Sequence, residues 1–569
     1  GVPSRFFRRG DKFVVETDGP DGKLKDYEVH SVAGIEPLQQ YLLEVEPGRL
    51  QALDLSWDAK AKRWYHLYPE QDLKGGDGLH WTGPYKNWNA RCAECHATGY
   101  EKKYEPRTRS YASTQAEIGV GCEACHGPGE AHLAWAKQPE EKATKSQSRL
   151  SDKGFTLAFT PKDAETEIQQ CAGCHSRRGP FDEKSPLPGT PFHDSYRLAL
   201  LRDGLYHADG SIQDEVYVYG SFLQSKMYDK GVRCSDCHSP HEADLKATGN
   251  AVCTQCHSPA GNERFPTLKK ASYEDPAHHF HEPDSAGAQC KSCHMIERVY
   301  MGIDGRRDHS FRVPRPDLSD KTGAPNACTD CHEDKDAAWA AAELKRRFPD
   351  SKHQGPHFSQ VFAAARRAPA TQTDKLVEVA LDSRLPDIVR ATALDLLRGS
   401  GPETATRVEW LLRHPSPLIR AAAVDLQTAL PMPKRLSRLE QALSDSTKLV
   451  RIAAARALLG APRSGVKRSL APALQAASSE WQKSLVANAD FPESHMAIGG
   501  TALALRNPRA ALQAFGEAVR QDPQLVDAWI MMTRIQLALR DRDGAKDVLN
   551  KGLSKNPDNQ FLQSMLKQL

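Results

Sequence analysis

The sequence lacks a long apolar segment, a large net charge and any cysteine outside one repeated motif. No stretch approaches the roughly 18 consecutive apolar residues that a membrane-spanning helix needs. Lysine and arginine exceed aspartate and glutamate by only three, so charge gives no reason to expect nucleic-acid binding. Cysteine is absent after Cys331. These absences exclude a transmembrane helix and a nucleic-acid-binding role, and they focus attention on the cysteines that are present.

All 14 cysteines belong to seven copies of Cys-x-x-Cys-His, the attachment motif of c-type haem. The thiols bind the haem vinyl groups, and the histidine that follows is the proximal iron ligand. The cysteine pairs are Cys92 and Cys95, Cys122 and Cys125, Cys171 and Cys174, Cys234 and Cys237, Cys253 and Cys256, Cys290 and Cys293, and Cys328 and Cys331. The proximal ligands are His96, His126, His175, His238, His257, His294 and His332.

A zinc site, a redox dithiol or a disulfide framework also uses paired cysteines. None of these needs a histidine directly after the second cysteine, and seven copies leave no cysteine over. The sequence therefore predicts seven covalently attached haem c groups, each containing iron.

Residues 76–333 form the predicted heptahaem domain. The 241 residues from Cys92 to His332 give about 34 residues for each of seven haems, too few to build an apolar core around each one. We expect the haems themselves to be the core of a loop-rich domain with short helices, rich in Gly, Pro and Asp. Within it, the polar stretch 138–155 predicts an exposed loop.

The remaining chain predicts a multidomain protein with β structure first and helical repeats last. Residues 1–75 contain short β-rich runs and the turn sequence Asp18-Gly-Pro-Asp-Gly-Lys23, which predict an antiparallel meander packed against the first haems. A free-standing small β domain is the alternative.

From Ala337 onward, the sequence becomes helical and repetitive. Arg390, Arg420 and Arg451 follow aliphatic pairs at spacings of 30 and 31 residues, which resembles short HEAT-like repeats over 334–485. Pro523 and Pro557 lie 34 residues apart, the tetratricopeptide period, so 486–569 is predicted to hold tetratricopeptide repeats. Such a solenoid either binds a partner or covers the haem domain, and the sequence supports both readings.

The second axial ligands determine whether a haem only carries electrons or can bind a small molecule. Histidine is unusually frequent around the motifs. The predicted distal ligands are His80, His132, His193, His207, His241, His279 and His309. In the cluster His278, His279 and His281, one ligand is expected and His279 is favoured, while His66 is interpreted as an ordinary histidine. Met227 and Met301 are further candidates, although methionine more often fills cores.

Two segments, Gly121-Cys-Glu-Ala-Cys-His-Gly-Pro-Gly-Glu-Ala-His132 and Cys234-Ser-Asp-Cys-His-Ser-Pro-His241, resemble the multihaem cytochrome c superfamily. It includes pentahaem nitrite reductase, octahaem hydroxylamine oxidoreductase, octahaem tetrathionate reductase and a tetrahaem electron carrier. The resemblance covers about residues 80–332 and implies that His132 and His241 are distal ligands. The Cys-x-x-Cys-Lys motif of nitrite reductase is absent, and there are seven sites rather than eight. Shared haem packing is implied, and shared catalysis is not.

The sequence therefore predicts an exported electron-transfer protein that passes electrons between redox partners along mostly bis-histidine haems. Without an initial Met, the chain is interpreted as a processed form in the periplasm or at the cell surface. One alternative is an enzyme that reduces or oxidises a small nitrogen or sulfur oxyanion at one open haem. Polar candidates for such a site are Arg177, Arg178, Tyr217, Tyr219, Lys226 and His278. The other alternative is a conductive filament that assembles by self-association through the C-terminal repeats.

Overall fold

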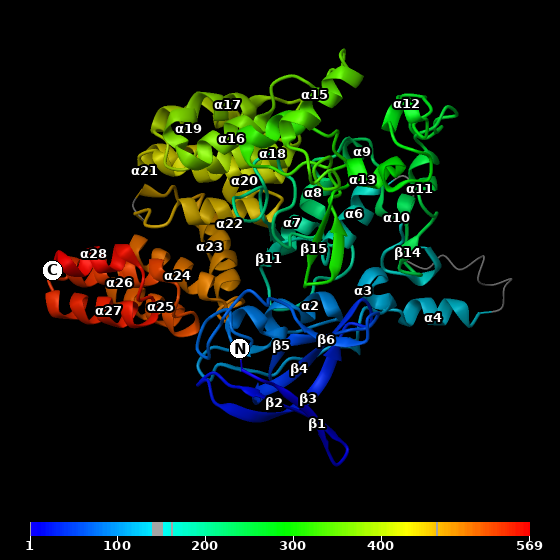
Figure 1. Ribbon diagram of the computed structural model, residues 1–569. Coiled ribbons are helices and arrows are strands. Elements are labelled where there is room, and N and C mark those ends of the chain that lie inside the picture. Colours follow the sequence, from blue (N-terminus) through cyan, green and yellow to red (C-terminus); the bar gives the residue numbers. More distant parts are fainter. Residues whose placement is uncertain (1, 139–151, 161–162, 463–464) are drawn as a thin grey trace.

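The computed structural model describes residues 2–138, 152–160, 163–462 and 465–569. An N-terminal sheet lies at one end, a region of short helices follows, and longer helices form the rest (Figure 1). Most of the expected loop 138–155 lies outside the described residues.

The N-terminal segment is a six-stranded antiparallel meander with the strands in sequence order. Its strands are β1 (Arg5–Arg9), β2 (Lys12–Asp18), β3 (Leu24–Ala33), β4 (Leu38–Glu46), β5 (Arg49–Asp58) and β6 (Arg63–His66). Val15, Leu43 and Leu53 pack under Trp81 on one face. The buried Gln51 side chain on β5 donates to the carbonyls of Trp81 and Gly83, so the sheet is joined to the chain that leads into the first motif. The predicted meander is present, and β5 contacts α1 (Trp88–Arg91), the helix that leads into the first motif.

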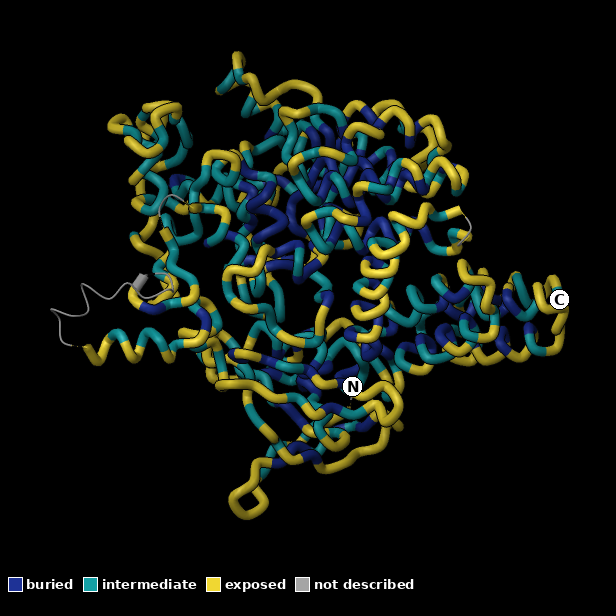
Figure 2. Tube along the Cα trace, turned by 180° about the vertical axis from the view of Figure 1, so that it is seen from behind, coloured by how far each residue is buried: buried dark blue, intermediate teal, exposed yellow. Residues whose placement is uncertain are grey.

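The segment that carries the motifs consists of short helices and turns. Its helices are α1 (Trp88–Arg91), α2 (Ala93–His96), α3 (Cys122–His126), α4 (Glu130–Ala136), α6 (Ala164–Ala172), α7 (Phe192–Ser195), α8 (Tyr219–Phe222), α9 (Lys226–Asp229), α10 (Cys234–Cys237), α11 (Ala251–Thr254), α12 (Pro276–His279), α13 (Cys290–His294) and α14 (Ser319–Thr322). Small hairpins join them, including β11 (Arg178–Pro180) with β12 (Tyr196–Leu198), and β15 (Glu297–Tyr300) with β16 (Asp304–Arg307). Between residues 234 and 300 nearly every residue is partly or fully exposed, in contrast to the buried helical repeats (Figure 2). This region has little protein core of its own.

A stack of helices follows the motifs. It comprises α15 (Ala337–Arg347), α16 (Phe358–Arg367), α17 (Thr373–Leu381), α18 (Asp387–Leu396), α19 (Pro402–Arg407), α20 (Pro417–Leu426), α21 (Met432–Leu439), α22 (Lys448–Ala457) and α23 (Ala471–Val486). The repeated arginines lie on α18, α20 and α22, and each donates to a carbonyl in the segment before its own helix. Arg390 bonds Ala380, Arg420 bonds His414 and Arg451 bonds Asp445. The arginine spacing therefore marks a repeated hydrogen bond between each helix and the chain that precedes it.

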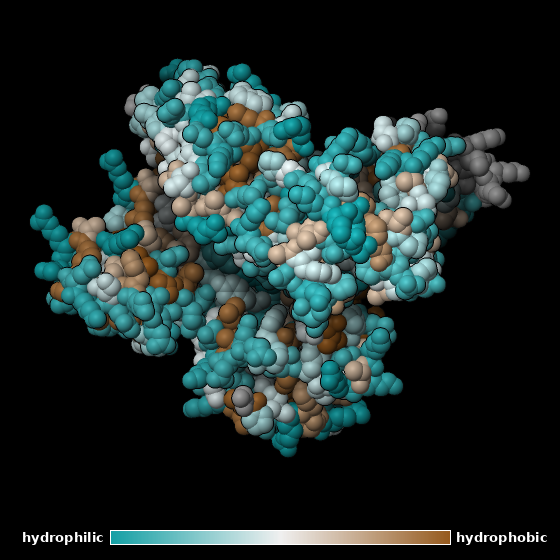
Figure 3. All heavy atoms as spheres, turned by 45° about the horizontal axis from the view of Figure 1, so that its top comes forward, coloured by the Kyte–Doolittle hydropathy of each residue, from teal (hydrophilic) through white to brown (hydrophobic). Residues whose placement is uncertain are grey.

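The last helices form antiparallel pairs. They are α24 (Pro492–Ala504), α25 (Pro508–Gln521), α26 (Val526–Ala538), α27 (Arg542–Lys555) and α28 (Gln560–Lys567). A Cβ at Gly499 would lie 2.5 Å from the Phe515 ring, so only glycine allows α24 and α25 to approach this closely. The surface in Figure 3 is mainly hydrophilic, with apolar patches on the lobe at the left, which carries these helices.

The helical repeats pack against the motif region through a shared apolar core. One apolar core runs from Ile168 on α6 through Phe192 and Phe362 to Leu485 on α23. The last repeats reach back to the N-terminal part, where the Lys102 Nζ lies 2.6 Å from the buried Asp490 carboxylate. Among the described helices, none combines the length and apolar character that crossing a membrane requires.

Candidate haem sites

Thiols from all seven motifs line one continuous cavity of about 3090 Å³. A site for a single small ligand measures about 300–1,000 Å³, so this cavity has room for several large groups. Within each motif the backbone makes one helical turn, for example from the His175 amide to the Cys171 carbonyl at 2.9 Å. That turn places both sulfurs and the imidazole on the same side. All 14 cysteines are free of disulfides.

Four of the seven motif histidines have a second imidazole opposite them. The ring centres are 6.2 Å apart for His126 and His241, 6.3 Å for His238 and His309, 6.3 Å for His294 and His278, and 6.1 Å for His332 and His281. A metal–imidazole bond is about 2 Å long, so two imidazoles on opposite faces of one metal have ring centres roughly 6 Å apart. The four pairs therefore match the spacing of bis-histidine iron.

Several of these imidazoles are held by carbonyls through Nδ1. His126 Nδ1 lies 3.1 Å from the Leu157 carbonyl, His294 Nδ1 lies 2.7 Å from the Arg312 carbonyl, and His309 Nδ1 lies 2.9 Å from the Arg307 carbonyl. A proton on Nδ1 leaves Nε2 with its lone pair free for a metal. Burial lowers the pKa of His96, His175, His238 and His257, which favours the neutral form that binds iron.

Two of the predicted distal ligands, His241 and His309, lie opposite a motif histidine. His241 follows the motif at Cys234 yet faces the motif at Cys122, so it reaches a neighbouring site rather than its own. Two others lie elsewhere in the fold. His80 is buried with Nδ1 2.8 Å from Thr82 Oγ1 and Nε2 3.1 Å from Asp18 Oδ2, so no nitrogen is left for iron. His193 lies in α7 against α22, away from the cavity, and burial lowers its pKa to about 4.

The other three predicted ligands have different surroundings. The His132 ring stacks on Phe155 at 3.9 Å, and its Nδ1 bonds the Lys153 carbonyl. The His207 ring makes no hydrogen bond within the described part of the chain. His279 Nε2 lies 3.2 Å from the Glu274 carbonyl. None of the three has a motif histidine opposite it among the described residues.

Sequence reasoning missed two kinds of residue. His278 and His281 both face motif histidines, whereas one ligand was expected from this cluster and His279 was favoured. His353 and His357 also line the cavity, although they lie beyond the range from which candidates were drawn. No local pattern marks them, because the helical stack brings them to the cavity.

Contacts between cysteines of different motifs give the spatial order of the sites. The Cys95 Sγ lies 3.8 Å from the Cys174 carbonyl, and the Cys234 thiol is close enough to raise the pKa of Cys171, as the Cys290 thiol does for Cys253. Three further pairs lie within electrostatic range: Cys125 and Cys171, Cys237 and Cys256, and Cys293 and Cys328. The sites therefore follow the order 92, 171, 234, 253, 290, 328, with the site at 122 branching from the site at 171.

Three motif histidines, His96, His175 and His257, have no histidine opposite them among the described residues. The surroundings of His96 are polar. Arg306 and Glu215 both act electrostatically on it, and the Arg306 guanidinium lies 2.5 Å from the Glu215 carboxylate. Tyr217 lies beside Arg306, with the guanidinium 5.9 Å from the ring centre.

The cavity also presents unsatisfied cationic donors. The Nε atoms of Arg91, Arg233 and Arg312 are buried without a hydrogen-bond partner among the described residues, and all three arginines line the cavity. Buried donors of this kind suit the propionate groups of haem, because arginine binds carboxylates strongly. Thiols, imidazoles, volume and orphaned guanidinium donors together fit c-type haem. The cysteines and histidines of the motifs would hold it, and it would supply reversible one-electron transfer.

Comparison with known proteins agrees with this chemistry. Residues 55–127 match the family of cytochrome c554 and c-prime, residues 227–262 match the doubled CXXCH motif, and residues 502–569 match the tetratricopeptide repeat. These matches show a multihaem c-type cytochrome that ends in a tetratricopeptide repeat.

Two individual proteins are also similar to this chain. The chain is 25% identical over 292 residues to the multiheme cytochrome MtrA of Shewanella baltica, covering 48% of this chain and 74% of that protein. The crystal structure of the outer cell wall cytochrome OcwA aligns with a TM-score of 0.40 and 17% identity, over 69% of this chain and 86% of that one.

Proposed function

We propose that the protein is an exported heptahaem cytochrome that conducts electrons between redox partners. The four histidine pairs with ring centres 6.1–6.3 Å apart carry this proposal, because a doubly capped iron can exchange electrons but has no free position for a substrate. The matches to multihaem cytochromes support the class. Location in the periplasm or at the cell surface accords with the need to attach haem after export.

The order of the motifs defines the path. Electrons would pass between neighbouring sites whose cysteines lie near one another, along 92, 171, 234, 253, 290 and 328. Cys122, Cys125 and Cys331 are the exposed cysteines, and they belong to the branch at 122 and to the far end at 328. These two places are where a donor and an acceptor can come nearest to a haem.

The test begins with haem content and ligation. The purified protein should carry seven haems per chain by pyridine haemochrome assay, and electron paramagnetic resonance should show at least four low-spin bis-histidine centres. Fewer than four such centres would contradict the proposal. Removal of the site at 171 by C171S/C174S should slow electron passage between the two exposed ends, whereas C122S/C125S should leave transfer along the 92-to-328 path intact.

A second candidate function is binding and turnover of a small oxyanion at the site of Cys92. His96 lacks an opposing histidine among the described residues, and Glu215, Tyr217 and Arg306 line the same part of the cavity. Tyr217 has φ +60°, a strained conformation for a residue with a side chain, and its hydroxyl makes no hydrogen bond within the described residues. Strained backbone conformations of this kind cluster at functional sites.

The second candidate has its own test. Wild type should then show a high-spin ferric signal and a Soret shift when cyanide or nitrite is added, and Y217F or R306K should weaken that shift. A completely low-spin spectrum, with no response to cyanide, would overturn it. A methionine charge-transfer band would also overturn it, because Met301 lines the cavity nearby.

A further inference from the structure

One short segment, residues 307–312, touches two different candidate haem sites. Its first carbonyl, on Arg307, accepts from Nδ1 of His309, which faces His238. Its last carbonyl, on Arg312, accepts from Nδ1 of His294, which faces His278. The segment also bonds backbone to backbone, from the Arg312 amide to the His294 carbonyl at 3.0 Å. Two imidazoles from separate sites therefore depend on the placement of six residues.

The first half of this segment is fixed by a buried carboxylate. Asp308 accepts hydrogen bonds from the Ile212 amide at 3.0 Å and from the Ser310 amide at 2.7 Å. The Asp308 amide in turn donates to the Ile296 carbonyl at 2.9 Å. Only 1% of Asp308 is exposed, so these bonds are shielded from water.

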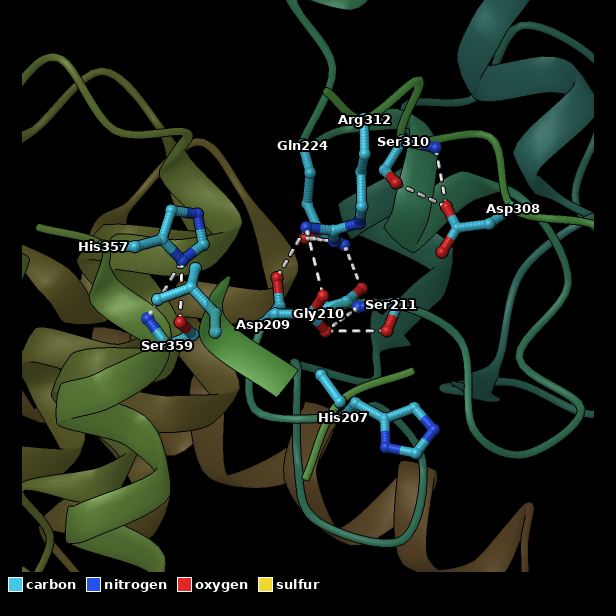
Figure 4. A network of polar contacts seen from close by, with 12 residues as sticks. His207, Asp209, Gly210, Ser211, Gln224, Asp308, Ser310, Arg312, His357 and Ser359 are labelled. Atoms are coloured by element: carbon cyan, nitrogen blue, oxygen red, sulfur yellow. Dashed lines mark hydrogen bonds and ion pairs between the residues drawn. The ribbon is translucent and has the colours of Figure 1, made fainter. Parts of the chain in front are cut away.

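The second half is fixed by the Arg312 side chain, which reaches across to another part of the chain (Figure 4). The guanidinium donates to the Asp209 carbonyl at 2.7 Å and to Gln224 Oε1 at 2.8 Å. Gln224 Nε2 donates to the Gly210 carbonyl at 3.0 Å and so closes a ring of contacts. A Cβ at Gly210 would lie 2.1 Å from Gln224 Oε1, so this ring requires glycine there.

We propose that segment 307–312 is a positioning element for two haem sites and that Arg312 is the residue that fixes it. The hydrogen bond from Nδ1 to a carbonyl sets the tautomer and orientation of a metal-bound histidine and raises its basicity. A more basic ligand stabilises ferric iron and lowers the reduction potential. Weakening the Arg312 clamp therefore raises the potential of the site at Cys290, and of the site at Cys234 to the extent that the segment moves as one piece. This inference rests on the bis-histidine ligation proposed above.

The sharpest test keeps a positive charge at position 312 and removes the planar guanidinium. Arg312→Lys retains a cation but lacks the planar guanidinium whose two nitrogens bond Asp209 and Gln224 at fixed positions, and Gln224→Ala removes one acceptor while leaving Arg312 in place. In each holoprotein, potentiometry should show one or two potentials rising, and the low-spin resonance signals of the same sites should change because the imidazole planes turn. Haem content should stay at the wild-type value.

Arg315→Lys is the matched control. Arg315 bonds Asp317 and the Gly355 carbonyl, and its own carbonyl anchors no imidazole. It should leave all potentials in place. Unchanged spectra in both Arg312→Lys and Gln224→Ala, or an equal shift at every site, would overturn the inference. If the Arg312→Lys variant loses haem, the potentials and resonance signals of Gln224→Ala alone decide the test. Absence of low-spin bis-histidine signals from wild type would instead overturn the proposed function.

Discussion

At the scale of single residues, the histidine cluster at the end of α12 shows how one short stretch can face two motif histidines. His278 lies on the helix, whereas His281 follows Phe280, whose φ of +59° turns the chain out of the helix. The two imidazoles therefore leave in different directions, one toward His294 and the other toward His332. His279, between them, bonds the Glu274 carbonyl instead.

This arrangement predicts separate effects for the three histidines. H278A and H281A should each convert one low-spin haem to a five-coordinate, high-spin form, because each removes one of two axial ligands. H279A should leave the spin states unchanged. Electron paramagnetic resonance of the ferric proteins distinguishes these outcomes, and a new high-spin signal in H279A alone would reverse the assignment.

The proximal residues could be predicted from sequence because thiols and imidazole occupy one turn of chain. The histidines that face them could not, because they come from other parts of the chain. His241 and His309 were identified by their place just beyond a motif or a turn, but His80 has the same sequence character and bonds Asp18 and Thr82. Only the fold shows which nitrogen is already used.

At the scale of elements, the buried ion pair between Lys102 and Asp490 joins the C-terminal repeats to the motif region. Their side chains are only 7% and 1% exposed, and Asp490 also accepts from the Tyr111 hydroxyl. Asp490→Asn leaves a buried lysine without its counter-charge, and loss of one partner from such a pair costs about 3–5 kcal/mol. Thermal unfolding should show a clear loss of stability. Glu493→Gln, which removes an exposed pair with Arg91, should cost under about 1 kcal/mol; equal losses would contradict the prediction.

The same interface should respond to acid. Burial raises the pKa of Glu517, but hydrogen bonds from Arg520 and Arg109 outweigh this effect and lower it to about 2. A depressed carboxyl pKa stabilises the fold above the ordinary value of 4.5, and the benefit disappears as pH falls toward 2. Glu517→Gln should therefore be less stable than wild type at pH 7, by on the order of 1 kcal/mol. The difference should vanish near pH 2, and a constant difference in denaturation curves would refute this account.

Elements with a strong period were predictable in advance. The tetratricopeptide spacing of Pro523 and Pro557 located the terminal helices, and the alternating pattern before residue 75 located the sheet. The residues through which the C-terminal repeats contact the motif region were not predictable. The partners of Lys102 and Arg109 lie about 400 residues away in the chain, at Asp490 and Glu517, and no local pattern records such contacts.

At the scale of the whole molecule, buried apolar side chains are unevenly distributed along the chain. The helical repeats contain most of the fully buried apolar side chains, whereas residues 234–300 contain almost none. Protein produced without haem attachment should therefore lose hydrogen-exchange protection across 234–300, while α24 to α28 keep theirs because they have an apolar core of their own. Equal protection with and without haem would show that the polypeptide alone forms this region.

The contact between the chain before the first motif and the start of α24 has a consequence for haem attachment. The first motif lies between the N-terminal sheet and α24, where the Arg91 guanidinium stacks 3.8 Å from the Phe491 ring. An enzyme that attaches haem must reach Cys92 and Cys95 before α24 packs beside them. Phe491 follows Cys92 by about 400 residues and is synthesised after it. Packing of α24 before haem attachment would hinder access to the two thiols.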